Sequence, residues 1–219
     1  MNKIIIRAFK PEDRFALRTL CCDVADRGEK IENFFPDRDL AADLLTKYYT
    51  DYEPQSSFVA LCDDRMVGYI NGCLDNRRHG LVMFWLLMPA LLVKAFKRGI
   101  FFRPEILELL RGSLKNWRRI FVWRKSSFHS HQGHLHIGIA RDFRHQQVGR
   151  DLVKTLGVLA GQKGIVELAA SVHDANRAAG AFFEAQGFVV RERYPMVLIR
   201  DGKQEQYHSL LYVKKILAF

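Results

Sequence analysis

Cysteine is scarce in this chain of 219 residues, and its four copies include no CxxC pair. This scarcity excludes a disulfide framework and a paired-cysteine zinc site, and we expect no bound metal. No signal peptide precedes the first apolar residues, so a reducing, cytoplasmic setting is the expectation. The four cysteines are Cys21, Cys22, Cys62 and Cys73.

Long apolar runs are also absent. The longest, Leu81–Val93, has 13 residues and contains Pro89, whereas a helix that spans a bilayer needs roughly 20 apolar residues. We therefore expect no transmembrane segment. Because 48% of the residues are hydrophobic, a globally disordered chain is excluded as well. The length fits one domain, residues 1–219, that buries its own core and carries an insertion.

Acidic residues are nearly missing from Asn76–His131, where twelve Lys and Arg face only Glu105 and Glu108. This segment accounts for the whole net charge of +10. Its aromatic residues alternate with basic ones, which would suit an anionic surface, yet amphipathic helices of this kind commonly cover their own domain. The segment could form a lid, a homodimer contact or a contact with an anionic acceptor or a CoA phosphate. Binding to a membrane surface or to a nucleic acid is less expected, and a nucleic-acid-binding insertion is kept as a third, weaker hypothesis.

The hydrophobic pattern predicts strands and helices around this segment. It is preceded by an N-terminal strand, a helix that begins at Pro11 and ends near Gly28, a second helix and a hairpin. Two helices are expected within it, so residues 76–131 are predicted to be a basic helical insertion between two strands. The expected ranges are Ile4–Ala8, Arg38–Tyr49, Ser57–Cys62, Met66–Leu74, Leu81–Phe96 and Pro104–Ile120.

The stretch from His134 to Phe188 predicts a strand, a turn, a helix, a second strand and a second helix. A turn that leads into a helix N-terminus points several backbone N–H groups outward, so this one predicts a site for a phosphate-bearing ligand. Three closing strands are expected after it. The ranges are His134–Ala140, Arg141–Arg150 for the turn, Asp151–Gly161, Val166–Val172, Val189–Glu192, Met196–Ile199 and His208–Lys214.

Two spaced motifs occupy this stretch. In the first, Arg144 and Gly149 match the ends of Arg/Gln-x-x-Gly-x-Gly/Ala, and Gln147 replaces its middle glycine. The second is an Asn followed by Ala at three, Tyr at seven and Gly-Phe at eleven and twelve. It is matched by Asn176, Ala179, Gly187 and Phe188, with Phe183 where Tyr is usual. In their order and placement, these motifs resemble the GNAT superfamily of acetyl-CoA-dependent N-acetyltransferases.

The resemblance implies an α/β (α+β) GNAT fold, with a mostly antiparallel mixed sheet splayed between its fourth and fifth strands and flanked by helices. It also implies acetyl-CoA as the cosubstrate, with the pantetheine arm on the fourth strand and the pyrophosphate on the turn. Asn176 would contact the cofactor, cap the following helix, or do both. The expected cofactor-binding residues are Ile137, Ile139, Arg144, His145, Gln146, Gln147, Val148, Gly149, Arg150, Asn176 and Phe183.

Acetyl transfer to an amine requires a base, and imidazole titrates near the working pH. His134 and His136 are the candidates, since some members of the superfamily use histidines on this strand. A register shift of one residue would turn both toward the opposite face, where core hydrogen bonds would hold them. Phe183 cannot donate a proton to the departing thiolate, so that role is either absent or moved to Tyr194 or Tyr207.

The expected function is acetyl transfer to a primary amine by direct attack in a ternary complex, because no cysteine lies in the motif region to form an acyl-enzyme. Gln147 and Phe183 motivate an alternative, a catalytically degenerate acyl-CoA-binding or protein-interaction module. Four pieces, three of them N-terminal, also resemble the acetyltransferase-like domain attached to some O-GlcNAcases: Cys21–Gly28, Tyr52–Ala60, Val67–Asp75 and His134–Ile137.

Overall fold

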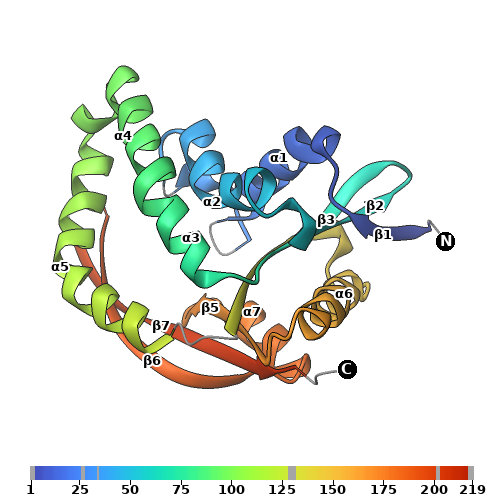
Figure 1. Cartoon of the computed structure of the whole chain (residues 1–219). Helices are drawn as coiled ribbons and strands as arrows, with labels where there is room; N and C mark the ends of the chain where they lie inside the picture. The colour runs from blue at the N-terminus through green and yellow to red at the C-terminus, as the bar shows by residue number, and fades with distance from the viewer. Residues whose placement is uncertain (1–2, 26–27, 34, 128–131, 201–202, 217–219) are drawn as a thin grey trace.

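The structure is a computed structural model that describes residues 3–25, 28–33, 35–127, 132–200 and 203–216 (Figure 1). Its strands form one sheet in the order β1-β2-β3-β4-β5-β7-β6. Neighbouring strands are antiparallel except for the parallel pair β4 and β5. The mixed, mostly antiparallel sheet is therefore confirmed. The strands are β1 Ile4–Ala8, β2 Ser57–Cys62, β3 Arg65–Cys73, β4 Gln132–Ile139, β5 Glu167–His173, β6 Val189–Arg200 and β7 Lys203–Lys215.

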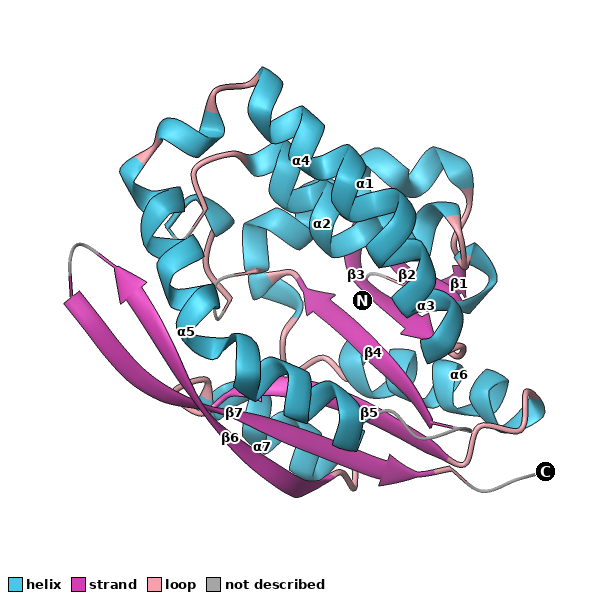
Figure 2. Ribbon diagram, turned by 60° about the vertical axis from the view of Figure 1, so that its left-hand side comes forward, coloured by secondary structure: helices cyan, strands magenta, loops and turns pink. Residues whose placement is uncertain are grey.

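Strands β4 and β5 pair only at their beginnings, where Gln132–His134 lies beside Glu167–Ala169. Beyond these residues the two strands diverge (Figure 2). The other edge of β4 stays paired with β3 as far as Ile139. The predicted splay is confirmed, and it leaves the β5-facing backbone groups of residues 135–139 open to a ligand.

Helices cover both faces of the sheet (Figure 1). The helices α1, Arg14–Val24, and α2, Arg38–Asp51, pack on one face, and α6, Val148–Gln162, packs on the other. Side chains alternate along a strand, so Val59 joins the core beneath α1 while its neighbour Ala60 joins the core beneath α6. The helix α7, Arg177–Ala185, follows β5 and contributes Phe183 to the α6 core.

The insertion folds into two helical arms (Figure 1). The first arm consists of α3, Asn76–Val82, a π-helical turn, Met83–Leu87, and α4, Met88–Lys97. The second is α5, Pro104–Ser127. Gly99 ends the first arm in a left-handed conformation with a φ of 65°. The two predicted helices are confirmed, with longer bounds. The last residues of the predicted insertion, 128–131, lie outside the described residues.

The sequence pattern predicts two strands on either side of Pro195, and this prediction is wrong. A single strand, β6, runs through Pro195. This is possible because β6 is an edge strand, where the missing N–H of proline can face away from β7 and no hydrogen bond of the sheet is lost. The outer edge of β6 is hydrogen-bonded by a side chain two residues after Pro195. Val197 N–H donates to Asn116 Oδ1 at 2.9 Å, and Asn116 Nδ2 donates to the Val197 carbonyl at 2.7 Å. Since Asn116 belongs to α5, the insertion is fastened to the far edge of the sheet.

Candidate functional site

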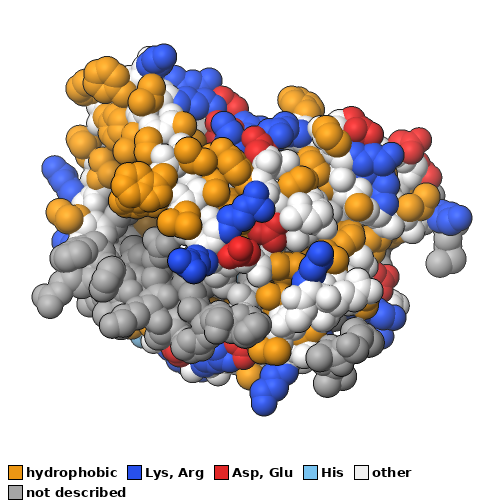
Figure 3. Space-filling model, in the orientation of Figure 1, with side chains coloured by type: hydrophobic (Ala, Val, Ile, Leu, Met, Phe, Trp, Pro, Cys, Tyr) orange, Lys and Arg blue, Asp and Glu red, His pale blue; other side chains and the backbone are white. Residues whose placement is uncertain are grey.

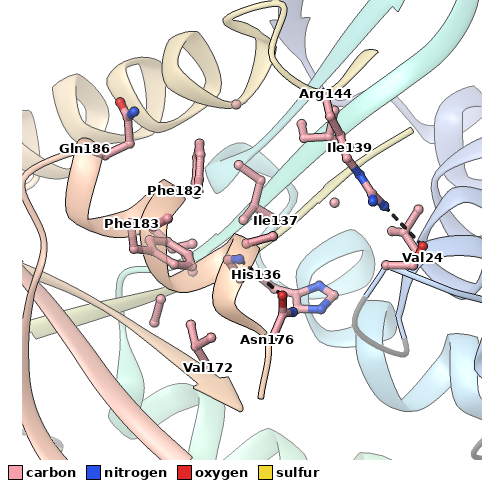
Figure 4. A pocket seen from close by; sticks show the side chains of 18 of the residues that line it. Val24, His136, Ile137, Ile139, Arg144, Val172, Asn176, Phe182, Phe183 and Gln186 are labelled. Atoms are coloured by element: carbon pink, nitrogen blue, oxygen red, sulfur yellow. Dashed lines mark hydrogen bonds between the residues drawn. The ribbon is translucent and has the colours of Figure 1, made fainter. Parts of the chain in front are cut away.

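A cavity of about 750 Å³ opens where β4 and β5 diverge. Residues 135–139 of β4 and 170–173 of β5 form two of its walls, and the turn before α6 and the helix α7 complete it. Figure 4 shows side chains from these elements converging on the space. Its described lining includes Arg144 and Arg150 but no aspartate or glutamate. The charge of the lining therefore favours an anionic ligand.

The turn before α6 has a left-handed backbone at two residues that are not glycine. The φ angle is 67° at His145 and 63° at Gln147. The helix starts at Val148, earlier than the predicted Asp151, so Gln147 stands directly before it. Gln147 thus adopts the conformation that glycine adopts easily, at a cost on the order of 1 kcal/mol. The first N–H groups of α6 consequently lie at the cavity wall, where a phosphate can accept hydrogen bonds.

Most of the expected cofactor-binding residues line this cavity, and two do not. The Gln146 amide donates to the carbonyl of Asp142 at 2.9 Å, and Val148 is buried in the core under α6. Arg144 reaches the segment after α1 and donates to the carbonyl of Gly28 at 3.2 Å. The expected residues that line the cavity are Ile137, Ile139, Arg144, His145, Gln147, Gly149, Arg150, Asn176 and Phe183.

Gly149 allows α6 and α7 to approach each other. A Cβ atom at this position would lie 2.8 Å from the ring of Phe182, which is closer than nonbonded carbon atoms pack. The expectation for this glycine is close approach of the backbone to a pyrophosphate. The contact that demands a glycine in the structure is the one with Phe182.

Asn176 and Phe183 both face the cavity from α7. Asn176 also caps this helix, because its Oδ1 accepts from the N–H of Ala179 at 3.1 Å. The ring of Phe183 is buried in edge contacts with Phe182 and Phe188, at centroid distances of 5.2 and 5.1 Å. Phe183 therefore presents an apolar wall where the family's tyrosine would present a hydroxyl.

His134 uses both ring nitrogens in the core. Its Nδ1 lies 2.6 Å from Asn76 Oδ1, and its Nε2 lies 3.0 Å from the Tyr49 hydroxyl. The Asn76 amide is oriented by donation from its Nδ2 to the carbonyl of Gln132. Nδ1 of His134 must therefore donate, and Nε2 accepts from Tyr49. His134 is not among the residues that line the cavity.

His136 does line the cavity, together with Tyr69, whose hydroxyl lies 3.3 Å from His136 Nδ1. Burial lowers the pKa of His136 to about 4 and that of His134 to about 3, so both imidazoles are neutral at pH 7. Of the two candidate bases, His136 is thus the one that can accept a proton from a ligand in the cavity. Its low pKa makes it a weak base.

Neither tyrosine considered as a general acid lines the cavity. Tyr194 packs beside Leu211 and Val213 on the sheet, and Tyr207 stacks on the ring of His173 at 4.2 Å. Tyr69 is the tyrosine that does line it, and burial raises the pKa of its phenol well above the ordinary value. The general-acid role therefore has no tyrosine of ordinary acidity at the described cavity wall.

A polar row crosses three strands beside the cavity, and sequence reasoning missed it. His136 lies opposite Asn71, and Asn71 lies opposite Ser57. Asn71 and Ser57 are fully buried, and among the described residues no partner bonds the Asn71 amide atoms or Ser57 Oγ. A buried polar group without a hydrogen-bond partner lowers stability by about 1–3 kcal/mol, and proteins retain such groups mostly where water or a ligand supplies the missing bond. Polar residues at inward positions of two predicted strands were the available signal.

Cys73, His79 and His134 are the described residues that offer metal-ligand atoms within 4.8 Å of one another. Burial raises the pKa of the Cys73 thiol, so the thiol keeps its proton. A cation would have to displace that proton and one of the two hydrogen bonds of His134. Cys73, His79 and His134 are therefore explained as part of a hydrogen-bonded polar network at the base of the insertion, without a metal ion.

Comparison with known proteins identifies the fold. The family model of the acetyltransferase (GNAT) domain matches residues 118–190. The crystal structure of SsHAT superimposes with a TM-score of 0.71 at 21% identity, over 98% of this chain and 99% of that one. An N-acetyltransferase from Staphylococcus aureus Mu50 gives 0.61 at 15% identity, over 98% and 99%. A ribosomal-protein-alanine N-acetyltransferase from Brucella melitensis gives 0.57 at 20% identity, over 97% and 99%. Curated protein sequences give no match.

The splayed sheet, the turn before α6 and the family match agree with one another. Residues 118–190 match the acetyltransferase (GNAT) domain, and the whole chain has the fold of solved N-acetyltransferases. The narrower resemblance to the O-GlcNAcase-associated domain stays a prediction.

Proposed function

We propose that this protein transfers the acetyl group of acetyl-CoA to a primary amine. The cavity in the splay carries the proposal, because it combines an open strand edge, a helix N-terminus and two arginines without an acidic residue. These are the features that an acyl-CoA needs for its amide-rich arm and its pyrophosphate. Arg144 and Arg150 would supply charge-assisted bonds to the phosphate oxygens.

The chemistry is a direct attack. The neutral amine nitrogen adds to the thioester carbonyl, the tetrahedral adduct collapses, and the carbon–sulfur bond breaks to release CoA. His136 would accept the proton that the amine loses, since its imidazole is neutral and lines the cavity. The buried Asn71 next to it has amide atoms without a partner among the described residues, which would bond an ordered water.

Calorimetric titration with acetyl-CoA tests the cofactor assignment. Arg144→Glu should weaken binding on the order of tenfold or more, because it reverses a charge at the phosphate site. The control is Lys154→Glu, which makes the same charge change on an exposed position of α6 that does not line the cavity. Equal losses in both variants, or no binding by the unaltered protein, would contradict the site.

Release of CoA thiol with a panel of amines tests the reaction. His136→Gln should lower kcat on the order of 100-fold while leaving acetyl-CoA affinity unchanged.

The specific observation of Phe183 at the cavity wall favours a second candidate, an acyl-CoA-binding module without turnover. Tight binding of acetyl-CoA with no thiol release from any amine would select that candidate over the enzyme.

A further inference from the structure

The first arm of the insertion exposes a large apolar surface. Residues 76–97 form 22 residues of helix, whose most apolar 18-residue window has a mean hydropathy of 1.7 and is only 17% buried. By length and composition the arm could cross a membrane. We call its exposed apolar side the outer face; its main side chains are Leu81, Phe84, Trp85, Leu92, Val93 and Phe96. Figure 3 shows apolar side chains gathered in the region of this arm.

Exposed leucines also line the start of α5. Leu107, Leu110 and Leu114 are exposed there, at the spacing of one helical stripe. Monomeric soluble proteins rarely leave contiguous apolar patches of this kind uncovered, so the surface requires a partner.

The inner side of the arm is tied to the domain. Leu91 and Ala95 pack with Leu40 of α2, and the Lys94 ammonium lies 2.7 Å from an Asp39 carboxylate oxygen and also pairs with Asp43. These contacts hold the arm alongside α2. The arm therefore presents its outer face sideways, as an amphipathic helix lies on a membrane, and does not project from the domain as a spanning helix would.

The charges on the first arm have one sign, whereas Glu105 and Glu108 lie among the basic residues at the start of α5. Residues 76–104 contain no aspartate or glutamate. Lys94 and Arg98 pair with acids of α2 and its N-cap. No ion pair with a described residue involves Arg77, Arg78, Lys97, Arg103 or Arg111, and all five are exposed. An apolar stripe with unpaired cations beside it complements a membrane whose surface is anionic.

We propose that this protein docks onto anionic lipid membranes through the outer face. A second copy of the chain is the rival occupant. A two-fold dimer would place the same surface against itself and so bring the unpaired cations of both copies together, which costs energy. An anionic lipid surface accepts both the apolar side chains and the cations.

Vesicle flotation of the full chain tests the proposal. The protein should float with vesicles of phosphatidylcholine and phosphatidylglycerol, and added salt should reduce the bound fraction. Pure phosphatidylcholine vesicles should bind far less. The double variant Trp85→Glu, Phe96→Glu should bind on the order of tenfold less or weaker still, because it removes apolar insertion and adds two negative charges. Both side chains are about two-thirds exposed, at 68% and 69%, so the thermal unfolding midpoint should stay unchanged.

The matched control is Phe15→Glu, an equally apolar and 81% exposed side chain on α1 outside the outer face, which should float like the unaltered protein. Absence of flotation with the anionic vesicles would overturn the proposal, as would an equal loss in Phe15→Glu. Sedimentation velocity supplies the remaining outcome. A dimer that dissociates in the Trp85→Glu, Phe96→Glu variant would assign the outer face to a second copy and would also overturn it.

Discussion

The helix α6 and the first arm of the insertion are both rich in apolar residues, yet they bury them very differently. The inward side of α6 is buried under the sheet along its whole length, at Val148, Leu152, Val153, Leu156 and Ala160. The arm of residues 76–97 buries Leu87, Leu91 and Ala95, half-buries Val82 and Met83, and exposes most of its other large side chains. Apolar content therefore does not say what a helix is for. The decisive observation is whether the chain itself supplies the neighbours.

Two adjacent leucines of the arm should show the largest difference in the free energy of unfolding when each is replaced by alanine. Leu91→Ala should lower the free energy of unfolding by about 2–4 kcal/mol, because Leu91 is only 8% exposed between α2 and the end of α4. Leu92→Ala, at 50% exposure, should change it by less than about 0.5 kcal/mol. Urea unfolding measures both. Equal effects would mean that the outer face is covered within the chain.

Two glycines of α6 offer the corresponding test on the buried helix. Gly149→Ala should destabilise by about 1–3 kcal/mol, since its Cβ would press on Phe182. Gly157→Ala should instead stabilise by about 0.5–1 kcal/mol, because its Cβ would meet only Ile216 at 3.9 Å and alanine favours helix. Thermal unfolding of the two variants checks the signs. A stabilised Gly149→Ala would show that α6 and α7 are not held in close contact.

Mild acid should lower the free energy of unfolding through His136, by less per pH unit than Leu91→Ala lowers it. The pKa of His136 is lowered to about 4 in the folded protein, so the unfolded chain binds more protons between that value and about 6.5. Stability is therefore retained above pH 6.5 and lost as the pH falls toward 4, by at most about 1.4 kcal/mol per pH unit for this group.

Urea unfolding between pH 7 and pH 5 measures this loss. The dependence on pH should be shallower in His136→Gln than in the unaltered protein. An unchanged slope in His136→Gln would argue that its imidazole is not buried as described.

The sequence predicted most of the elements because their signals are local. Periodicity located the helices of the insertion, and two spaced motifs located the turn, α6 and α7. His134 and His136 share one face of β4, and they differ because β4 pairs with β5 at His134 but not at His136. Asn76, 58 residues from His134, also bonds its ring, so no local pattern could separate the two histidines. Pro195 misled the strand prediction because its position at the edge is a property of the whole sheet.

The same limit applies to the insertion. Charge counting found that Asn76–His131 is basic, and hydropathy alone could not say which of its apolar residues would be left outside. That division depends on where α2 lies, since Leu40, Asp39 and Asp43 select the inner side of the arm.

Asn116 has a consequence for self-association. An edge strand normally offers unpaired backbone groups to which another chain can add a strand. On β6 the amide of Asn116 occupies both backbone groups of Val197, much as a neighbouring strand would. Strand-by-strand aggregation at this edge is thereby blocked in mid-strand. The Val197 N–H should also exchange with solvent deuterium as slowly as an interior sheet amide, although it lies at the rim.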